Sequence, residues 1–321
     1  MTAGEGPLLF VMGPTGAGKS ALALALAARL PVEIVSVDSA QVYRGFDIGT
    51  AKPNPAVQRR VRHHLLDICA PCDAYSAAQF RSDAQAAIAD IRARGRVPML
   101  VGGTGLYFRA LEQGLSELPA ATPAVRAQLQ SELASLGALV LHERLTAVDP
   151  RAAARIHPND PQRLLRALEV HAVSGIAQSD LWERARLAPH RGQIVKLVIA
   201  PADRALLQRR LALRFDLMLE RGFINEVRAL RDRAGLGADA PAMRTVGYRE
   251  VWRYLVGDST RAHMIERGVI ATRQLAKRQL TWLRREAACH WLDCADTALT
   301  DRALRIIQEQ NVFKRNVYDL E

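Results

Sequence analysis

The segment GPTGAGKS, residues 13–20, constrains the fold more than any other part of the sequence. Its spacing, G-x-x-x-x-G-K-S, lies between the apolar segment LLFVMG and a helix-forming alanine–leucine segment. Between a strand and a helix, this spacing forms a P-loop, whose backbone N–H groups converge on phosphate oxygens. Lys19 would neutralise phosphate charge and the hydroxyl of Ser20 would bind Mg²⁺. The loop therefore predicts a diphosphate group in the ligand but does not identify the ligand.

Apolar segments and helical patterns alternate along the chain and predict an α/β protein. Five apolar segments are expected to be strands, which end at Met12, Asp38, Gly103, Ala200 and Asp293. Because they are apolar almost throughout, they are typical of parallel strands buried on both faces of a sheet. Helices are expected at 20–29 and at 76–94, where Ser76 and Gln79 form a capping box.

The expected architecture is a P-loop NTPase-like parallel sheet with a helical insertion subdomain and a helical C-terminal region. Residues 122–186 contain no strand pattern, and proline-bearing segments lie on both sides of them. The chain would therefore divide into the first part of the α/β core at 1–118, the helical insertion at 119–188, and the completion of the core with the C-terminal helices at 189–321.

The charge of the chain favours a polyanionic partner. Its 44 lysines and arginines exceed its 33 acids by 11, and ten basic residues against four acids lie between Arg244 and Ala288. Nucleic acid would explain this excess, and a solvated basic face is the alternative. No apolar segment reaches membrane-spanning length and the first strand begins by Leu8, so a cytoplasmic protein that binds no membrane is expected. The four cysteines are expected to be incidental, with a zinc site or a disulfide as the alternative.

Two other strand ends should lie beside the P-loop, because the carboxyl ends of parallel strands meet at one edge of the sheet. One carries DSAQVYRGFDIGTAKP, beginning at Asp38, and the other carries VGGTGLYFRAL, which contains Thr104. In an ordinary ATPase the acid that supports Mg²⁺ would follow the third strand, whereas here the acid follows the second. Asp38 can be a general base, an indirect ligand of Mg²⁺ or the cap of the following turn, and its position alone leaves these three roles open.

Six segments in order resemble the tRNA dimethylallyltransferases, the family that prenylates the adenosine immediately 3′ of the anticodon. They are GPTGAGKS, DSAQVYRGFDIGTAKP, VGGTGLYFRALEQGL, RIHPNDPQRLLRALEV, MRTVGYREVW and ATRQLAKRQLTWLR. The chain departs from the family pattern at Gly16 and Ala17, where Ala-Ser is common, and at CAPC, where cysteines are unusual. The resemblance implies transfer of a dimethylallyl group from dimethylallyl diphosphate to N6 of adenosine 37, in tRNAs that read codons beginning with U, with release of diphosphate.

The resemblance also implies catalytic roles. Asp38 would remove a proton from the N6 amine, and Thr104 would lie beside that amine. Lys19, Arg214 and Mg²⁺ held partly through Ser20 would neutralise the departing diphosphate. A position on a helix surface is the alternative for Arg214. The diphosphate would be bound by Gly13, Pro14, Thr15, Gly16, Ala17, Gly18, Lys19 and Ser20.

The anticodon stem-loop of tRNA is the partner that the resemblance implies, with the target adenine flipped out of its stack. The chain would act as a monomer, and its helical insertion would contact the tRNA. The implied tRNA contacts are Asp38, Ser39, Ala40, Gln41, Thr104, Arg126, Gln162, Arg163, Leu164, Leu165, Arg166, Met243, Arg244, Thr245, Val246, Gly247, Tyr248, Arg249, Lys277, Arg278, Gln279, Leu280, Thr281, Trp282, Leu283 and Arg284.

The segment ATRQLAKRQLTWLRREA predicts an amphipathic helix. Its apolar face would consist of Ala276, Leu280, Leu283 and Ala287. The adjoining basic stripe would consist of Arg273, Lys277, Thr281 and Arg284, which could follow the phosphates of an RNA strand.

Two other classes of function remain as alternatives. A small-molecule kinase would use the same loop for ATP and Asp38 to deprotonate a hydroxyl group, but it would leave the basic C-terminal half unexplained. An RNA-binding P-loop protein without catalytic activity would explain the basic half, but it would leave the acid and the threonine at the strand ends unexplained.

Overall fold

The structure is a computed structural model that describes residues 6–114, 118–119, 122–184, 189–233 and 236–313. The chain forms two compact units, the core unit of residues 1–110 and 191–321 and the helical unit of residues 111–190. None of the described helices is both long and apolar enough to span a membrane.

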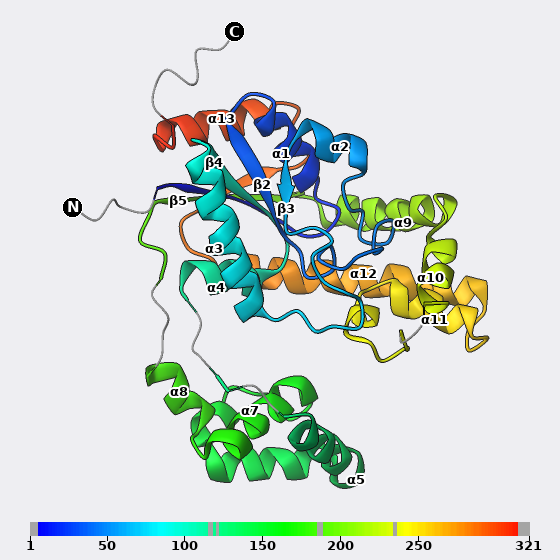
Figure 1. Cartoon of the computed structure of the whole chain (residues 1–321). Helices are drawn as coiled ribbons and strands as arrows, with labels where there is room; N and C mark the ends of the chain where they lie inside the picture. Colours follow the sequence, from blue (N-terminus) through cyan, green and yellow to red (C-terminus); the bar gives the residue numbers. More distant parts are fainter. Residues whose placement is uncertain (1–5, 115–117, 120–121, 185–188, 234–235, 314–321) are drawn as a thin grey trace. The chain divides into compact units, whose positions relative to one another are not determined.

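A parallel six-stranded sheet forms the centre of the core unit, with strand order β3-β2-β4-β1-β5-β6 (Figure 1). The strands are β1 (Leu8–Met12), β2 (Val32–Val37), β3 (His63–His64), β4 (Val97–Gly102), β5 (Ile194–Ala200) and β6 (Cys289–Asp293). This sheet confirms the predicted α/β class and five predicted strands. Strand β3 was not predicted because two residues carry no periodicity. Strands β1 and β2 are buried throughout, whereas β6 is an edge strand on which Trp291 is 47% exposed.

Helices cover both faces of the sheet. The helices of the core unit are α1 (Lys19–Ala27), α2 (Pro55–Arg60), α3 (Ala77–Ala93), α4 (Gly105–Glu112), α9 (Arg204–Glu220), α10 (Phe223–Arg231), η1 (Pro241–Arg244), α11 (Tyr248–Leu255), α12 (Arg261–Leu283) and α13 (Leu299–Glu309). Helices α1 and α13 lie on one face and α3, α4 and α12 on the other (Figure 1). The predicted capping box begins α3, where Ser76 Oγ accepts the Gln79 N–H and Gln79 Oε1 accepts the Ser76 N–H.

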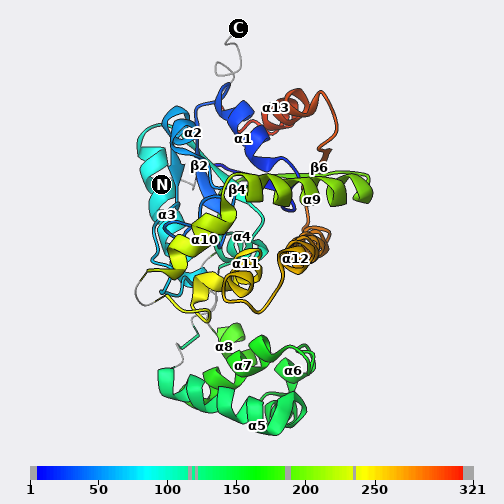
Figure 2. The same cartoon turned by 90° about the vertical axis from the view of Figure 1, so that its right-hand side faces the viewer.

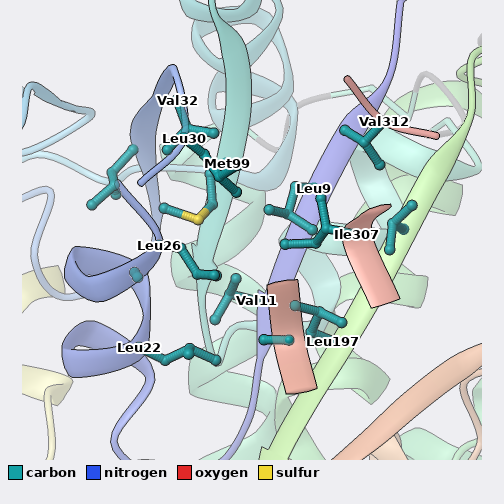
Figure 3. Packing of buried hydrophobic residues seen from close by; sticks show 14 of the residues in the cluster. Leu9, Val11, Leu22, Leu26, Leu30, Val32, Met99, Leu197, Ile307 and Val312 are labelled. Atoms are coloured by element: carbon teal, nitrogen blue, oxygen red, sulfur yellow. The ribbon is translucent and has the colours of Figure 1, made fainter. Parts of the chain in front are cut away.

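The largest apolar core joins the sheet to α1 and α13 (Figure 3). Leu9, Val11 and Leu197 of the strands pack against Leu22 of α1 and Ile307 of α13, and none of these side chains is more than 2% exposed. Each buried aliphatic side chain of this size contributes about 1.5 to 3 kcal/mol. The strand that leads into the P-loop is therefore held rigidly.

A second core lies where α9, α10, α11 and α12 pack side by side (Figure 2). Phe223, Phe215 and Tyr248 lie in its centre, and the ring of Phe46 stacks on Tyr248 with centroids 4.2 Å apart. Phe46 belongs to the segment between β2 and α2, so this core fixes a loop that the sequence analysis assigned to the site.

The helical unit consists of α5 (Pro123–Val148), α6 (Pro150–Ala153), α7 (Pro161–Ser174) and α8 (Gln178–Arg184). These helices lie within the predicted insertion at 119–188, although its boundaries stay predictions. Helix α5 is two helical segments joined at Gly137, whose φ of 83° favours glycine. The apolar core of the helical unit includes Leu129, Leu145, Leu164 and Leu168.

A buried carboxylate joins three segments at the amino ends of the central strands. Glu33 of β2 is 3% exposed and accepts two hydrogen bonds from Arg94, at 2.9 and 2.8 Å. His64 Nε2 of β3 lies 2.7 Å from Glu33 Oε2. The bonds from Arg94 hold the pKa of Glu33 at about 2, against the desolvation that would raise it.

We expect Glu33→Gln to lower the free energy of unfolding at pH 7 by about 3 kcal/mol. Because the folded state lowers the pKa, this contribution is fully present above the unfolded pKa of about 4.3 and is lost as the pH falls toward 2. Urea unfolding between pH 7 and pH 2.5 should show the two stability curves converge. Asp301→Asn, which removes an exposed ion pair with Arg29, should cost less than about 1 kcal/mol. A constant gap between wild type and Glu33→Gln at every pH would contradict the assignment.

Candidate active site

The carboxyl ends of three central strands lie at one level. Met12 of β1 and Val37 of β2 both pair with Gly102 of β4, so the P-loop, Asp38 and Gly103 begin side by side. A cavity of about 530 Å³ opens at this edge, between the P-loop, the loops that follow β2 and β4, and helices α9 and α12. The predicted meeting of the three strand ends is therefore confirmed.

The P-loop has the backbone of a phosphate cradle. Gly16 and Gly18 have φ values of 79° and 88°, where a side chain would be strained. Gly18 precedes α1, and no side chain caps that helix, so its first N–H groups are available to an anion. Lys19 Nζ donates to the carbonyl of Pro14 at 2.8 Å, which curls the lysine over the loop.

Two cations and one carboxylate converge in the cavity. Burial lowers the pKa of Lys19 to about 8, with Asp38 opposing that shift and Arg214 adding to it. Burial also lowers the pKa of Arg214, and Asp38 again opposes the shift. Arg214 thus lies inside the cavity wall, not on an open helix surface. An anion that bound between the two cations would be strongly favoured, because it would relieve their mutual repulsion.

Asp38 has two distinct oxygens. Its Oδ1 accepts the backbone N–H groups of Ala40, at 2.8 Å, and Gln41, at 3.4 Å, so Asp38 does cap the turn that follows β2. Its Oδ2 accepts no hydrogen bond from the described residues. Across the cavity, Thr104 Oγ1 accepts the N–H of Ser39 at 3.1 Å, which ties the loop after β4 to this turn. One oxygen thus shapes the loop, and the other is left for a ligand.

The wall formed by FDIGTAK depends on a carboxylate that sequence reasoning missed. Glu226 of α10 accepts the consecutive N–H groups of Asp47, Ile48 and Gly49, at 3.2, 2.6 and 3.2 Å, and the hydroxyl of Tyr248 at 2.5 Å. Three successive N–H groups form an anion-binding nest, and here a side chain fills it. No local pattern could reveal this contact, because Glu226 lies almost 180 residues from the loop.

Lys52 is the second residue that holds this wall. Its side chain is 3% exposed, and Nζ donates to the Tyr43 carbonyl and to the carboxylates of Asp47 and Asp67 at 2.6 to 2.8 Å. All three of its N–H donors are therefore used within the protein. The loop then presents the carbonyl of Thr50, which accepts from Arg214 Nη2 at 3.4 Å.

Many of the predicted tRNA contacts in the core unit surround this cavity. Those that line it are Asp38, Ser39, Ala40, Gln41, Thr104, Arg244, Thr245, Val246, Gly247, Arg278 and Gln279. Arg249, Lys277, Thr281 and Arg284 are exposed, while Leu280 and Trp282 are half-buried. Exposure of Arg273, Lys277 and Thr281 on α12 agrees with the predicted stripe.

Several predictions need correction. Met243, Tyr248 and Leu283 are at most 1% exposed and pack in apolar cores, so their side chains stabilise the fold and do not reach RNA. Leu164 is likewise fully buried in the helical unit. Ala287 does not continue the apolar face of α12, because the helix ends at Leu283 and Ala287 is exposed.

The remaining predicted contacts lie on the helical unit. Gln162 and Arg163 are exposed at the start of α7, and Leu165 is half-buried. Arg126 Nε donates to Glu169 at 3.0 Å, and Arg166 donates to the carbonyl of Pro119 at 3.0 Å. Arg126 is thus exposed but already paired with an acid.

The residues fit a magnesium ion that takes oxygens from its substrate. Ser20 is exposed in the cavity next to Lys19, and Asp38 lines the same cavity. Mg²⁺ is usually held by one or two protein oxygens with the remaining ligands from phosphate and water. No group of three or more His, Cys, Asp or Glu residues in the described parts of the chain could hold a metal. None of the four cysteines forms a disulfide within the described residues.

Comparison with known proteins places the chain among transferases. The family model for IPP transferase matches residues 41–286, and that for isopentenyl transferase matches residues 7–71. The chain is 35% identical to tRNA isopentenylpyrophosphate transferase of Bacillus halodurans, with 96% of this chain and 98% of that chain covered and a TM-score of 0.68. The corresponding protein of Staphylococcus epidermidis is 32% identical, with coverage of 95% and 99% and a TM-score of 0.68. A eukaryotic dimethylallyltransferase acting on tRNA is 27% identical, with coverage of 95% and 79% and a TM-score of 0.79. The chain belongs to the IPP transferase family.

Proposed function

We propose that this protein transfers the dimethylallyl group of dimethylallyl diphosphate to the exocyclic N6 amine of adenosine 37, immediately 3′ of the anticodon. The tRNAs that read codons beginning with U are the substrates, and N6-dimethylallyladenosine and diphosphate are the products. The observation that carries the proposal is the convergence of Lys19, Arg214 and Asp38 on one cavity behind a P-loop. The tRNA-specific names of the similar proteins support the acceptor.

The reaction forms a C–N bond at the allylic carbon and breaks the C–O bond to diphosphate. The lone pair of the amine is delocalised into the purine ring, so removal of its proton as the bond forms favours attack. Asp38 would take that proton on Oδ2, because Oδ1 accepts the backbone N–H of Ala40 in the turn. Thr104 lies beside the same turn, where its hydroxyl can orient the amine.

Departure of the diphosphate places negative charge near the P-loop. Lys19 and Arg214 neutralise that charge in a site where burial has already made both cations less hydrated. Ser20 would help to hold Mg²⁺, which would supply further charge neutralisation to the departing diphosphate. A small-molecule kinase would use the same loop, but no observation in the cavity favours it.

The anticodon stem-loop contacts two basic surfaces in this proposal. Arg244 and Arg278 at the cavity bind the backbone beside the flipped base, and the stripe on α12 binds phosphates further along the strand. The helical insertion, through Gln162 and Arg163, is a third contact. The protein acts as a monomer in the cytoplasm.

Transfer of label tests the function directly. Protein, Mg²⁺ and unmodified tRNA are incubated either with dimethylallyl diphosphate labelled in the allyl group or with ATP labelled in the γ-phosphate. The allyl label should appear in tRNA, at adenosine 37, and the phosphate label should not be transferred. Transfer of phosphate to a small molecule would favour the kinase, and RNA binding without transfer of either label would favour a non-catalytic binding protein.

We expect the basic stripe to determine the salt dependence of tRNA binding. Arg273, Lys277 and Arg284 are exposed, and none of them pairs with an acid among the described residues. Each phosphate that they neutralise releases counterions, so the triple change to glutamine should reduce the slope of log affinity against log salt by about two to three. Diphosphate binding should stay nearly intact, because none of these three side chains lines the cavity.

Filter-binding titrations across a range of salt measure this slope. The matched control changes Arg29, Arg302 and Arg305 to glutamine, which removes the same charge from exposed positions on α1 and α13 or next to them. The control should keep the wild-type slope. If the stripe variant also kept it, the stripe would be a solvated face and the tRNA would bind elsewhere.

A further inference from the structure

Gln279 joins two walls of the cavity through its side-chain amide. Its Oε1 accepts the backbone N–H of Thr15 in the P-loop at 2.8 Å, and its Nε2 donates to the carbonyl of Gly103 after β4 at 3.1 Å. The sequence analysis placed Gln279 among the tRNA contacts, but both ends of its amide are used within the protein. The residue therefore clamps the P-loop to the neighbouring strand end.

The loop after β4 packs closely against α12 around this clamp. A Cβ atom on Gly103 would lie 2.3 Å from Gln279 Nε2, and one on Gly105 would lie 2.5 Å from the indole of Trp282. A side chain at either position would therefore displace Gln279 or Trp282, and glycine lets the loop backbone approach α12 this closely. The turn that presents Thr104 thus rests directly on two residues of this helix.

The same turns of α12 carry the cations Lys277 and Arg278, of which Lys277 belongs to the stripe, as does Thr281. Lys277 and Arg278 directly precede Gln279, and Thr281 follows it two positions later, with all three exposed. A helix rises 1.5 Å per residue and moves as a rod, so a shift imposed on these cations also moves the Gln279 amide. The P-loop and the exposed face of α12 are therefore mechanically connected through one side chain.

We propose that Gln279 is a positioning residue that couples RNA binding on α12 to diphosphate binding in the P-loop. The proposal rests on the proposed function, since it takes the exposed face of α12 as the RNA surface. Binding of RNA to that face fixes the helix, and the clamp then fixes Thr15 and the loop backbone around the diphosphate. Coupling of two sites requires a contact that differs between their states, and in this proposal that contact is the Gln279 amide.

The experiment measures coupling without chemistry. Calorimetry gives the affinity for inorganic pyrophosphate with Mg²⁺, in the absence and in the presence of a saturating anticodon stem-loop. The wild type should bind pyrophosphate at least about fivefold more tightly when the stem-loop is present. Gln279→Ala should bring this ratio close to one and leave stem-loop binding without pyrophosphate unchanged. Gln274→Ala, which removes an exposed glutamine from the same helix, should keep the wild-type ratio.

Three results would overturn the proposal. In the first, the stem-loop leaves the affinity of the wild type for pyrophosphate unchanged, and in the second it raises the affinity of Gln279→Ala as much as that of the wild type. The third is that Gln279→Ala loses stem-loop binding in the absence of pyrophosphate. The last would show that Gln279 contacts RNA directly. If Gln279→Ala does not fold, Gln279→Glu replaces it, because the carboxylate still accepts from Thr15 but cannot donate to Gly103. Its ratio should also approach one. Label transfer by the wild type tests the proposed function separately, so the two can fail independently.

Discussion

Asp38→Ala is expected to lower kcat by about 10² to 10⁴ while the affinity for diphosphate changes little. The proton acceptor is lost, but the P-loop and its lysine are retained. The alanine variant alone is ambiguous, because Asp38 Oδ1 also caps the turn through Ala40 and Gln41. A slow Asp38→Ala enzyme is therefore the expected result for a base and also for a purely structural cap.

Asp38→Asn separates the two roles. The asparagine carbonyl oxygen can still accept the N–H of Ala40, but the amide cannot take a proton at neutral pH. We expect Asp38→Asn to be as slow as Asp38→Ala, with a thermal unfolding midpoint closer to the wild type. Single-turnover rates and thermal unfolding measure both quantities. Wild-type turnover in Asp38→Asn would show that Asp38 acts only as a cap.

The third role, an indirect contact with Mg²⁺, predicts a different response. If Asp38 orients a water on the metal, Asp38→Asn should raise the Mg²⁺ concentration required for half-maximal activity. If Asp38 is the base, turnover should stay low at every Mg²⁺ concentration. A titration with Mg²⁺ at saturating substrates therefore resolves the three roles that the sequence leaves open.

Local patterns predicted the parts of this fold that are built locally. The P-loop is a contiguous segment. The strand ending at Met12 is apolar throughout and the strand ending at Ala200 is apolar except for Lys196, because both faces of the sheet are covered. The rule that parallel strands end at one edge predicts that Asp38 and Thr104 lie beside the P-loop, and all of them line one cavity.

Contacts between distant segments could not be predicted in this way. Glu226 holds the FDIGTAK loop from a helix almost 180 residues away, and Gln279 reaches Thr15 across 264 residues. Neither residue differs in type from the polar residues around it, so periodicity and composition carry no signal for it. The segment MRTVGYR shows a second limit of sequence analysis, because its residues have different roles although they are neighbours in the sequence. Arg244 lines the cavity, whereas Met243 and Tyr248 fill the core behind it.

Lys19→Ala is expected to weaken diphosphate binding by about 10² to 10³ and to lower turnover as well, because the charge that the lysine neutralises grows as the diphosphate leaves. Calorimetry with a non-reactive diphosphate analogue measures the affinity. Lys19→Arg provides the matched variant, since it keeps a charge in the loop but cannot lose its proton. It should bind diphosphate more tightly than Lys19→Ala.

The pH dependence of the wild type tests the same residue without altering it. With a pKa of about 8 in the free protein, Lys19 loses its charge as the pH rises through the range where the diphosphate is already ionised. Bound diphosphate favours the charged form and raises that pKa, so binding takes up a proton above pH 8. Wild-type affinity should therefore fall by about tenfold per pH unit between 8 and 9.5, while Lys19→Ala and Lys19→Arg should show little change.

Calorimetry at pH 9 in two buffers of different ionisation enthalpy should detect the proton uptake in the wild type alone. An affinity that stayed constant over this range would mean that Lys19 remains charged up to pH 9.5. Burial in the cavity would then not lower the pKa of Lys19 to about 8.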